Sequence, residues 1–143
     1  MKCTVHIGED HEEEILIFAR SKTPLITAIE QLIAEDSTVL IGFRGTEKVR
    51  LYPPEVDCFL VENNKVYALS GQEKWQLKCR LYHLEEQLSG SFIKINQSCL
   101  INPKRIARFR ASFSGALQVQ LKNGYTDYVS RRNLKSIKER FGL

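Results

Sequence analysis

The sequence predicts a mostly β protein of about ten short strands, with one short helix in the middle of the chain and another at its C-terminus. Short apolar runs recur along the chain, and Gly, Pro and Asn residues separate them as turns do. Strands and helices do not alternate regularly, which argues against a doubly wound parallel sheet. The length of 143 residues and the hydrophobic content of 43% suit one domain with a small extension.

The N-terminal residues predict a hairpin. Residues 2–7 alternate between apolar and polar side chains, and the apolar run at 15–19 is the expected returning strand. Between them, residues 8–14 form an acidic turn. A histidine beside such carboxylates can bind a metal, but a solvated turn accounts for the same residues, and we expect no metal here.

A helix is expected after this hairpin. Thr23 can cap its N-terminus, and Pro24 suits the first helical position. Its apolar residues fall on one face at helical spacing. They are Leu25, Ile29, Leu32 and Ile33. Residues 1–36 are therefore expected to form an acidic β-β-α extension, and residues 37–143 the main domain.

Strands dominate the first half of the main domain. Turn residues, among them Gly45 and the pair Asn63-Asn64, separate the apolar runs. Pro53 and Pro54 interrupt regular pairing and mark a corner. The expected strands span residues 39–43, 49–52, 58–61, 66–69 and 74–77.

The second half adds two helices and further strands. Residues 79–88 have leucines at helical spacing, which predicts the mid-chain helix. Asn123-Gly124 is the signal of a tight hairpin, and Ser130 can cap a last helix over residues 131–141. The expected strands span residues 92–95, 99–101, 105–113, 117–121 and 126–129.

A polar triplet, Asn96-Gln97-Ser98, interrupts the apolar stretch that runs from Phe92 to Asn102. Its uncharged side chains donate and accept hydrogen bonds, so they can read a base edge or bind a phosphate oxygen. The same side chains can instead tie down the backbone of their own loop. Chemistry alone favours the second interpretation.

Charge is divided unevenly along the chain. Residues 1–50 hold six Lys or Arg and nine Asp or Glu, a net charge of −3, whereas residues 51–143 hold fifteen and eight, a net charge of +7. The basic part has the charge balance of a nucleic-acid binder, although a solvated basic surface has the same composition. The cations that could bind phosphates are Lys94, Lys104, Arg105, Arg108, Arg110, Lys135 and Lys138.

Several classes of function find no support in the sequence. It holds no Gly-rich phosphate loop, nucleophile elbow or HExxH motif, so we expect no enzyme, no cofactor and no small-molecule substrate. The four cysteines form no zinc pattern, and we expect them to be reduced and buried. With no apolar run of membrane-spanning length and no signal peptide, the protein is expected in the cytoplasm.

The second half of the chain resembles the LytTR DNA-binding domain family. The similarity lies in "GSFIKINQSCLINPKRIARF" and "GALQVQLKNGYTDYVSRRNLKSIKERF". It is close over about fifty residues and looser over roughly three quarters of the chain. The matching features are Phe92, the polar triplet, Asn102, Ile106, the Asn123-Gly124 hairpin and Val129-Ser130-Arg131-Arg132.

The resemblance implies a stack of small antiparallel sheets and a sequence-specific transcription regulator. Such a regulator inserts loop residues into successive major grooves of double-stranded DNA, and it is expected to act as a homodimer on paired repeats. Base contacts are implied in the loop before the strand at 66–69, in the polar triplet and at the start of the last helix. The residues at these places are Asn64, Lys65, Asn96, Gln97, Ser98, Arg131, Arg132 and Asn133.

Two of these positions depart from the family pattern. Lys65 stands where the family often has His, Tyr or Asn, and its charge favours phosphate over base contact. Asn96 stands where the family often has His or Arg, so the DNA sequence that is read can differ.

The role of residues 1–36 stays open between two interpretations. They do not resemble a phosphoacceptor receiver domain. Short chains of this family type are often encoded beside a membrane protein that holds them inactive, which would make the extension a dimer or inhibitor contact. A cap that completes the fold is the equal alternative. The alternative function is thus a protein-interaction module held by a membrane-bound inhibitor, with DNA binding secondary.

Overall fold

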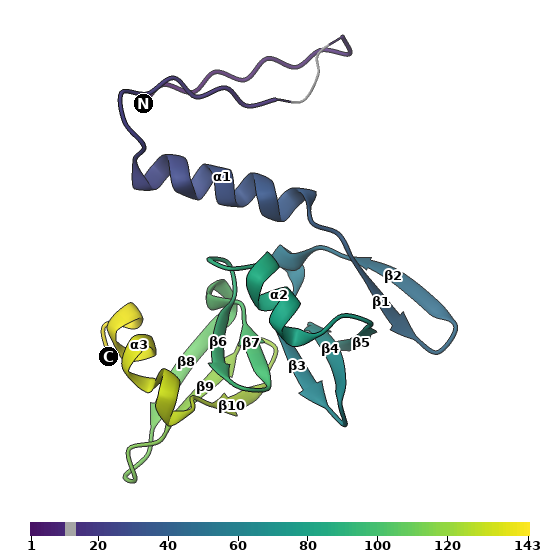
Figure 1. Ribbon diagram of the computed structural model, residues 1–143, viewed down its shortest axis with the longest axis vertical. Coiled ribbons are helices and arrows are strands. Elements are labelled where there is room, and N and C mark those ends of the chain that lie inside the picture. Colours follow the sequence, from purple (N-terminus) through teal and green to yellow (C-terminus); the bar gives the residue numbers. More distant parts are fainter. Residues whose placement is uncertain (11–13) are drawn as a thin grey trace.

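The structure is mostly β, as the sequence predicts (Figure 1). The computed structural model describes residues 1–10 and 14–143. The helices are α1 (Pro24–Ser37), α2 (Leu81–Gln87) and α3 (Arg131–Phe141), with short 3-10 helices η1 (Pro53–Glu55) and η2 (Pro103–Arg105). The strands are β1 (Leu40–Arg44), β2 (Glu47–Leu51), β3 (Cys58–Glu62), β4 (Lys65–Ser70), β5 (Glu73–Leu77), β6 (Ile93–Asn96), β7 (Cys99–Ile101), β8 (Ile106–Ala111), β9 (Leu117–Leu121) and β10 (Thr126–Tyr128).

The strands of the described residues form two antiparallel sheets. The larger sheet has seven strands in the order β2-β1-β5-β4-β3-β7-β6, and the smaller has three in the order β10-β9-β8. Most neighbours are hairpins, which need only short turns. The expected Asn123-Gly124 turn closes one of them, with Gly124 at a φ of 93°. Two pairings join strands far apart in the sequence, β1 with β5 and β3 with β7.

β3 and β7 lie inside the larger sheet and are buried on both faces. Because successive side chains of a strand point to opposite faces, Phe59 and Leu100 pack on the side of α2. Cys58, Cys99 and Ile101 pack on the other side, toward the smaller sheet and α3. Residues 40–143, called the body below, therefore form three layers (Figure 1). A register slip of one residue would exchange the side chains on the two faces of these strands.

The four cysteines are free thiols. Cys58 and Cys99 are buried as expected, and Cys79 is half-buried. The neighbouring Cys58, together with burial, raises the pKa of the Cys99 thiol far above its ordinary value, so this thiol stays protonated and packs as a small apolar group. Cys3 is exposed, contrary to the expectation, because its segment has no core to pack against.

The N-terminal hairpin expected from the sequence is not formed as two strands. Residues 2–7 and 15–19 contain no strand, and residues 11–13 of the expected acidic turn lie outside the described residues. The described residues 1–10 and 14–22 form an irregular arm next to α1 (Figure 1). An isolated two-stranded hairpin is marginally stable, and here most side chains of both segments are exposed, so no packed face stabilises it.

The expected helix does follow the arm. The Oγ1 of Thr23 accepts a hydrogen bond from the Ile26 N–H at 3.4 Å, and Pro24 takes the first helical position, as predicted. Over residues 24–34 of α1, the buried side chain is that of Ile26, which the predicted apolar face omits. Members of that predicted face that remain exposed are Leu25, Leu32 and Ile33.

α1 meets the body of the molecule at few points. The Nε2 of Gln31 donates a hydrogen bond to the Ser89 carbonyl at 2.9 Å, and the helix also contacts η1. A groove of about 300 Å³ lies along this junction, between Leu32 on α1 and Pro103 on η2. The contacts described leave the apolar side chains of Leu25, Leu32 and Ile33 exposed.

Asn102 is buried and joins three segments. Its Nδ2 donates to the Val56 carbonyl at 3.1 Å, and its Oδ1 accepts from the Lys104 N–H at 3.1 Å. Its own backbone N–H donates to the Asp57 carbonyl at 2.9 Å. The Asp57 carboxylate in turn accepts from the Gly71 N–H at 2.8 Å. These bonds hold the corner at η1 against η2 and so fix where the main chain leaves β7.

We expect Asn102→Ala to lower the free energy of unfolding by about 2–3 kcal/mol, because the Val56 carbonyl and the Lys104 N–H lose their partner in a buried place. Urea denaturation measures the loss. Gln72→Ala is the matched control, since it removes one exposed hydrogen bond to the Asn123 carbonyl, and it should change stability by no more than about 0.5 kcal/mol. Equal losses in the two variants would contradict this role of Asn102.

Candidate nucleic-acid interface

The polar triplet forms the turn between β6 and β7. The Oδ1 of Asn96 accepts a hydrogen bond from the Ser98 N–H at 2.8 Å, and its Nδ2 donates to the Tyr128 carbonyl at 2.9 Å. Asn96 therefore shapes the turn and ties it to the end of β10, which is the tethering role considered above for the triplet. Gln97 and Ser98 are exposed, and their side chains make no hydrogen bond within the described residues.

The start of α3 lies beside this turn. The backbone N–H of Ser130 donates to the Ile95 carbonyl at 2.8 Å. Ser130 occupies the N-cap position as expected, but its hydroxyl accepts from the Asn133 side chain at 2.9 Å instead of from a backbone N–H. Arg131 and Arg132 follow on the first turn of the helix, and both are exposed.

The turn between β3 and β4 lies next to the triplet turn. Asn63 and Asn64 take positive φ angles of 50° and 62°, a conformation that Asn tolerates better than most residues and that tight hairpins require. The Val61 N–H donates to the Ser98 carbonyl at 2.9 Å and so joins the end of β3 to the triplet turn. Lys65 begins the returning strand and is exposed.

Three segments far apart in the sequence are thus brought together at the end of the body that lies away from α1 (Figure 1). They are the turns at 62–65 and 96–98 and the start of α3 at 130–133. Each is a place to which the family resemblance assigns base contact. The exposed polar side chains gathered here belong to Asn64, Lys65, Gln97, Ser98, Arg131 and Arg132.

Three of the predicted phosphate-binding cations lie less favourably for contact with DNA phosphates. The Lys94 Nζ is 3.6 Å from a carboxylate oxygen of Glu85, and the Arg105 guanidinium donates to the Pro54 carbonyl at 3.1 Å. Lys104 is exposed, but it lines the groove beneath α1. It follows β7, whereas the triplet turn precedes that strand, so the two lie at opposite ends of it.

The other four cations lie on exposed surfaces that border the gathered turns. Lys135 lies four residues after Arg131, and Lys138 lies three residues after Lys135, so the three side chains share one face of α3. Arg108 and Arg110 are exposed on β8, where they pair with strand β9. Basic groups therefore continue from the start of α3 in two directions.

One exposed residue at this end has no role implied by the resemblance. Phe113 stands in the turn between β8 and β9 and is fully exposed. The Val129 N–H donates to the Leu117 carbonyl at 2.9 Å, which holds the base of this hairpin close to the start of α3. An aromatic residue within a turn of Ser and Gly is unusual, and that signal was present in the sequence.

Neither a metal centre nor a membrane helix is found in the part of the chain that the structure describes. Among the side chains that the structure describes, those of residues 1–10, 14–34 and 38–143, no cluster of three His, Cys, Asp or Glu could hold a metal ion. Within the same ranges, no helix combines the length and the apolar character needed to cross a bilayer.

Comparison with known proteins identifies related chains. The model of the LytTr DNA-binding domain matches residues 46–142. An uncharacterized HTH-type transcriptional regulator of Staphylococcus aureus strain NCTC 8325 is 36% identical over 119 residues, which cover 83% of this chain and 80% of that one. A regulator of the same description from strain MRSA252 matches to the same extent.

A solved structure shares the fold. A LytTr DNA-binding domain from Bacillus cereus superposes with a TM-score of 0.69 over 75% of this chain and 99% of that one, at 18% sequence identity. In the described residues, strands separate α1, α2 and α3, so no two helices are joined directly by a short turn. The expression HTH-type therefore belongs to the names of the relatives and not to the architecture found here.

Truncation of Asn96 and truncation of Gln97 should affect the stability of the protein differently. Asn96→Ala removes both hydrogen bonds that hold the turn, so we expect the free energy of unfolding to fall by about 1–2 kcal/mol. Gln97→Ala removes an exposed side chain and should leave stability within about 0.5 kcal/mol of the unmodified protein. Thermal and urea denaturation check both. A stability loss in Gln97→Ala equal to that in Asn96→Ala would refute the division of roles.

Proposed function

The chain belongs to the LytTR DNA-binding domain family, and from this premise we propose that it is a sequence-specific transcriptional regulator that reads DNA with the three segments gathered at one end of its body. The observation that carries the proposal is their convergence. Turns 62–65 and 96–98 and the start of α3 lie together and present polar side chains to solvent. The family is defined by DNA binding and not by a reaction.

Base recognition is assigned to the side chains that are free of internal bonds. The amide of Gln97 can pair with adenine N6 and N7, and the guanidinium of Arg131 or Arg132 can pair with guanine O6 and N7. Asn64 and Ser98 add further donors and acceptors. Because these groups stand on turns and on a helix start, the turns themselves would enter successive major grooves, and no recognition helix is needed.

Asn96 and Asn133 are assigned a supporting part in this scheme. Both side chains are half-buried and already bonded, Asn96 to Ser98 and Tyr128, and Asn133 to Ser130. Their hydrogen bonds hold the triplet turn and the first turn of α3 in fixed positions. Preorganised side chains lose less conformational entropy when DNA binds, so these contacts would contribute to affinity without touching a base.

Phosphate contact is assigned mainly to the exposed cations that border the three segments proposed to read DNA. Lys135 and Lys138 extend the face of Arg131 along α3, and Arg108 and Arg110 stand on β8. Lys65 is added because a compact ammonium group suits phosphate better than a base edge. Each neutralised phosphate releases counterions, so binding would weaken steeply as the salt concentration rises.

Regulation is expected to work on paired repeats, with a homodimer bound to both. Since its target is DNA, we place its action in the cytoplasm. A membrane-bound inhibitor that holds the chain through its N-terminal residues remains the alternative means of control, and the exposed apolar side chains of the arm are the observation that favours a protein contact there.

Arg132→Ala tests the base contacts. We expect specific binding to weaken by about 1–3 kcal/mol and the preference at one base position to relax, because a bidentate donor pair is lost. The DNA is obtained by selecting binding sites from random sequence, and affinity is measured by fluorescence anisotropy. Arg140→Ala, at the other end of α3, should keep both affinity and preference. Unchanged binding by Arg132→Ala would rule out this reader.

Lys135→Ala tests the phosphate surface, with Lys104→Ala as its matched control. Loss of Lys135 should weaken specific and non-specific binding alike, and should lower the slope of log affinity against log salt by about one unit. Lys104 lies beneath α1, so its loss should change neither quantity. A larger slope change for Lys104→Ala than for Lys135→Ala would show that DNA lies on a different face.

A further inference from the structure

The arm exposes a run of five apolar residues with a charge of opposite sign at each end. Residues 15–19 read Ile-Leu-Ile-Phe-Ala, and Glu14 and Arg20 flank them. Leu16 is 68% exposed and Phe18 is 93% exposed. A continuous apolar run of this kind is typical of a strand that is covered on both faces, so its exposure in the single chain is unusual.

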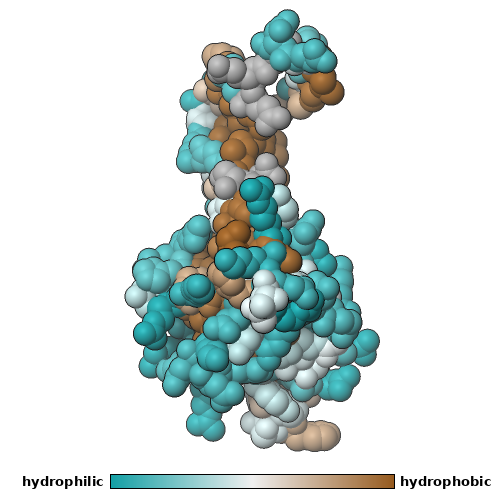
Figure 2. Space-filling model, turned by 90° about the vertical axis from the view of Figure 1, so that its right-hand side faces the viewer, coloured by the Kyte–Doolittle hydropathy of each residue, from teal (hydrophilic) through white to brown (hydrophobic). Residues whose placement is uncertain are grey.

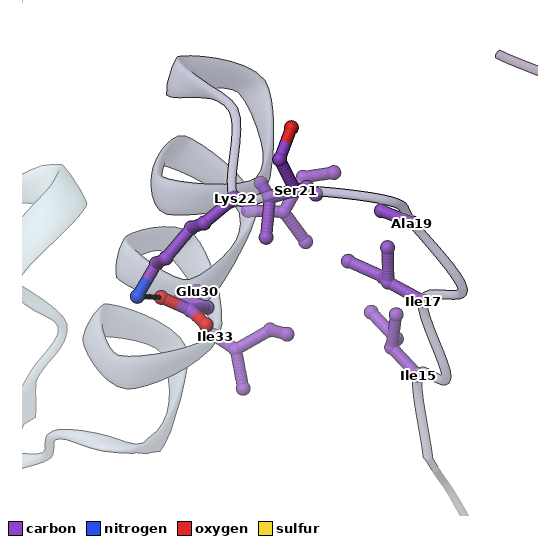
Figure 3. Close-up of a pocket in the computed structure, with 9 residues that line it drawn as sticks. Ile15, Ile17, Ala19, Ser21, Lys22, Glu30 and Ile33 are labelled. Carbon is purple, nitrogen blue, oxygen red and sulfur yellow. Dashed lines mark ion pairs between the residues drawn. The ribbon is translucent and has the colours of Figure 1, made fainter.

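One side of this run faces α1. Figure 3 shows Ile15, Ile17 and Ala19 on the side of the segment that looks toward the helix. With Ile26 and Ile33 they line an open groove of about 450 Å³, and only Ile26 is buried. Figure 2 shows apolar surface along the arm and α1, in contrast to the mostly hydrophilic face of the body. The helix therefore covers the run incompletely.

The other side of the run has no cover in the described structure. Leu16 and Phe18 alternate with the residues that line the groove, and neither belongs to its lining. The described segment also takes part in no hydrogen-bonded strand pairing. A hairpin becomes independently stable when further strands join it over an apolar face or a helix. A strand supplied by another molecule would meet that need.

The sequence around the run is complementary to itself. If two copies of the segment pair antiparallel about Ile17, Leu16 of one copy lies opposite Phe18 of the other, and Glu14 lies opposite Arg20. Aromatic and aliphatic side chains form favourable cross-strand pairs, and opposite charges at both ends favour this register over a parallel one. Such an isologous contact uses the same residues on both subunits, as two-fold dimers do.

We propose that the occupant of this surface is a second copy of the chain, and that the segment from Glu14 to Arg20 is the centre of a two-fold dimer contact. The two arms form a continuous sheet, with one α1 beneath each half. The arm and the three segments proposed to read DNA lie at opposite ends of the molecule (Figure 1). The dimer therefore leaves these segments free in both copies. The proposed dimer forms without DNA. It rests on the proposed function in one respect only: two associated chains would supply one DNA-binding unit to each of the paired repeats.

The test is the association state of the full chain in the absence of DNA. Sedimentation equilibrium distinguishes the 16.5 kDa monomer from a dimer of twice that mass. We expect the unmodified chain to dimerise. Glu14→Arg and Arg20→Glu should each weaken dimerisation on the order of tenfold, because each places like charges opposite each other in two symmetric pairs. The double variant Glu14→Arg/Arg20→Glu should restore it.

Two further variants make the result specific. Phe18→Asp should abolish the dimer while leaving the thermal melt of the body unchanged, because Phe18 contacts no core cluster. Glu55→Arg changes an exposed charge on η1 and should leave dimerisation unaffected. A monomeric unmodified chain would overturn the inference and leave the arm to a different partner, and a double variant that fails to restore the dimer would overturn it too. DNA binding is measured separately with a single half-site, so failure of the dimer and failure of the reading surface give different results.

Discussion

The pairing of β3 with β7 inside the larger sheet is the constraint on which the positions of the reading segments depend. Three residue pairs join these strands, Cys58 with Ile101, Phe59 with Leu100 and Leu60 with Cys99. Every one of these side chains is buried, so the register cannot slip without exposing core on one face and burying mismatched groups on the other. The turns that leave β3 and enter β7 are therefore held at the same end of the sheet.

The same constraint extends to the C-terminal helix. Ile95, next to the triplet, is fully buried, and its carbonyl accepts the hydrogen bond from Ser130 that seats the start of α3. Ile137 buries the middle of α3 in the same hydrophobic cluster as Cys99. In the proposed function, recognition of DNA is thereby linked to packing, because a change in the core between the sheets would move two of the three segments together. The arm and α1 take no part in these contacts, and we propose that they serve association at the far end.

Much of this arrangement could be predicted from local patterns, since short apolar runs, turn residues and helical spacing are properties of neighbouring residues. The strands of the main domain, the Asn123-Gly124 turn and all three helices follow from them. The exposure of residues 2–7 and 15–19 could not be predicted, because a strand pattern does not reveal whether a partner surface exists. The bonds of Asn96 and Arg105 depend on Tyr128 and Pro54, which are distant in the sequence, so only the folded chain separates tethered side chains from free ones.

The most direct measurement is the change in backbone amide NMR shifts of the full chain when a selected DNA site is added. Such shifts report contact at each residue without any substitution. We expect the largest changes at residues 62–65, 96–98 and 130–133, with smaller changes along the exposed faces of α3 and β8 and little change in the arm. Changes concentrated in the arm, in α1 or around η2, with the three reading segments unaffected, would contradict this expectation.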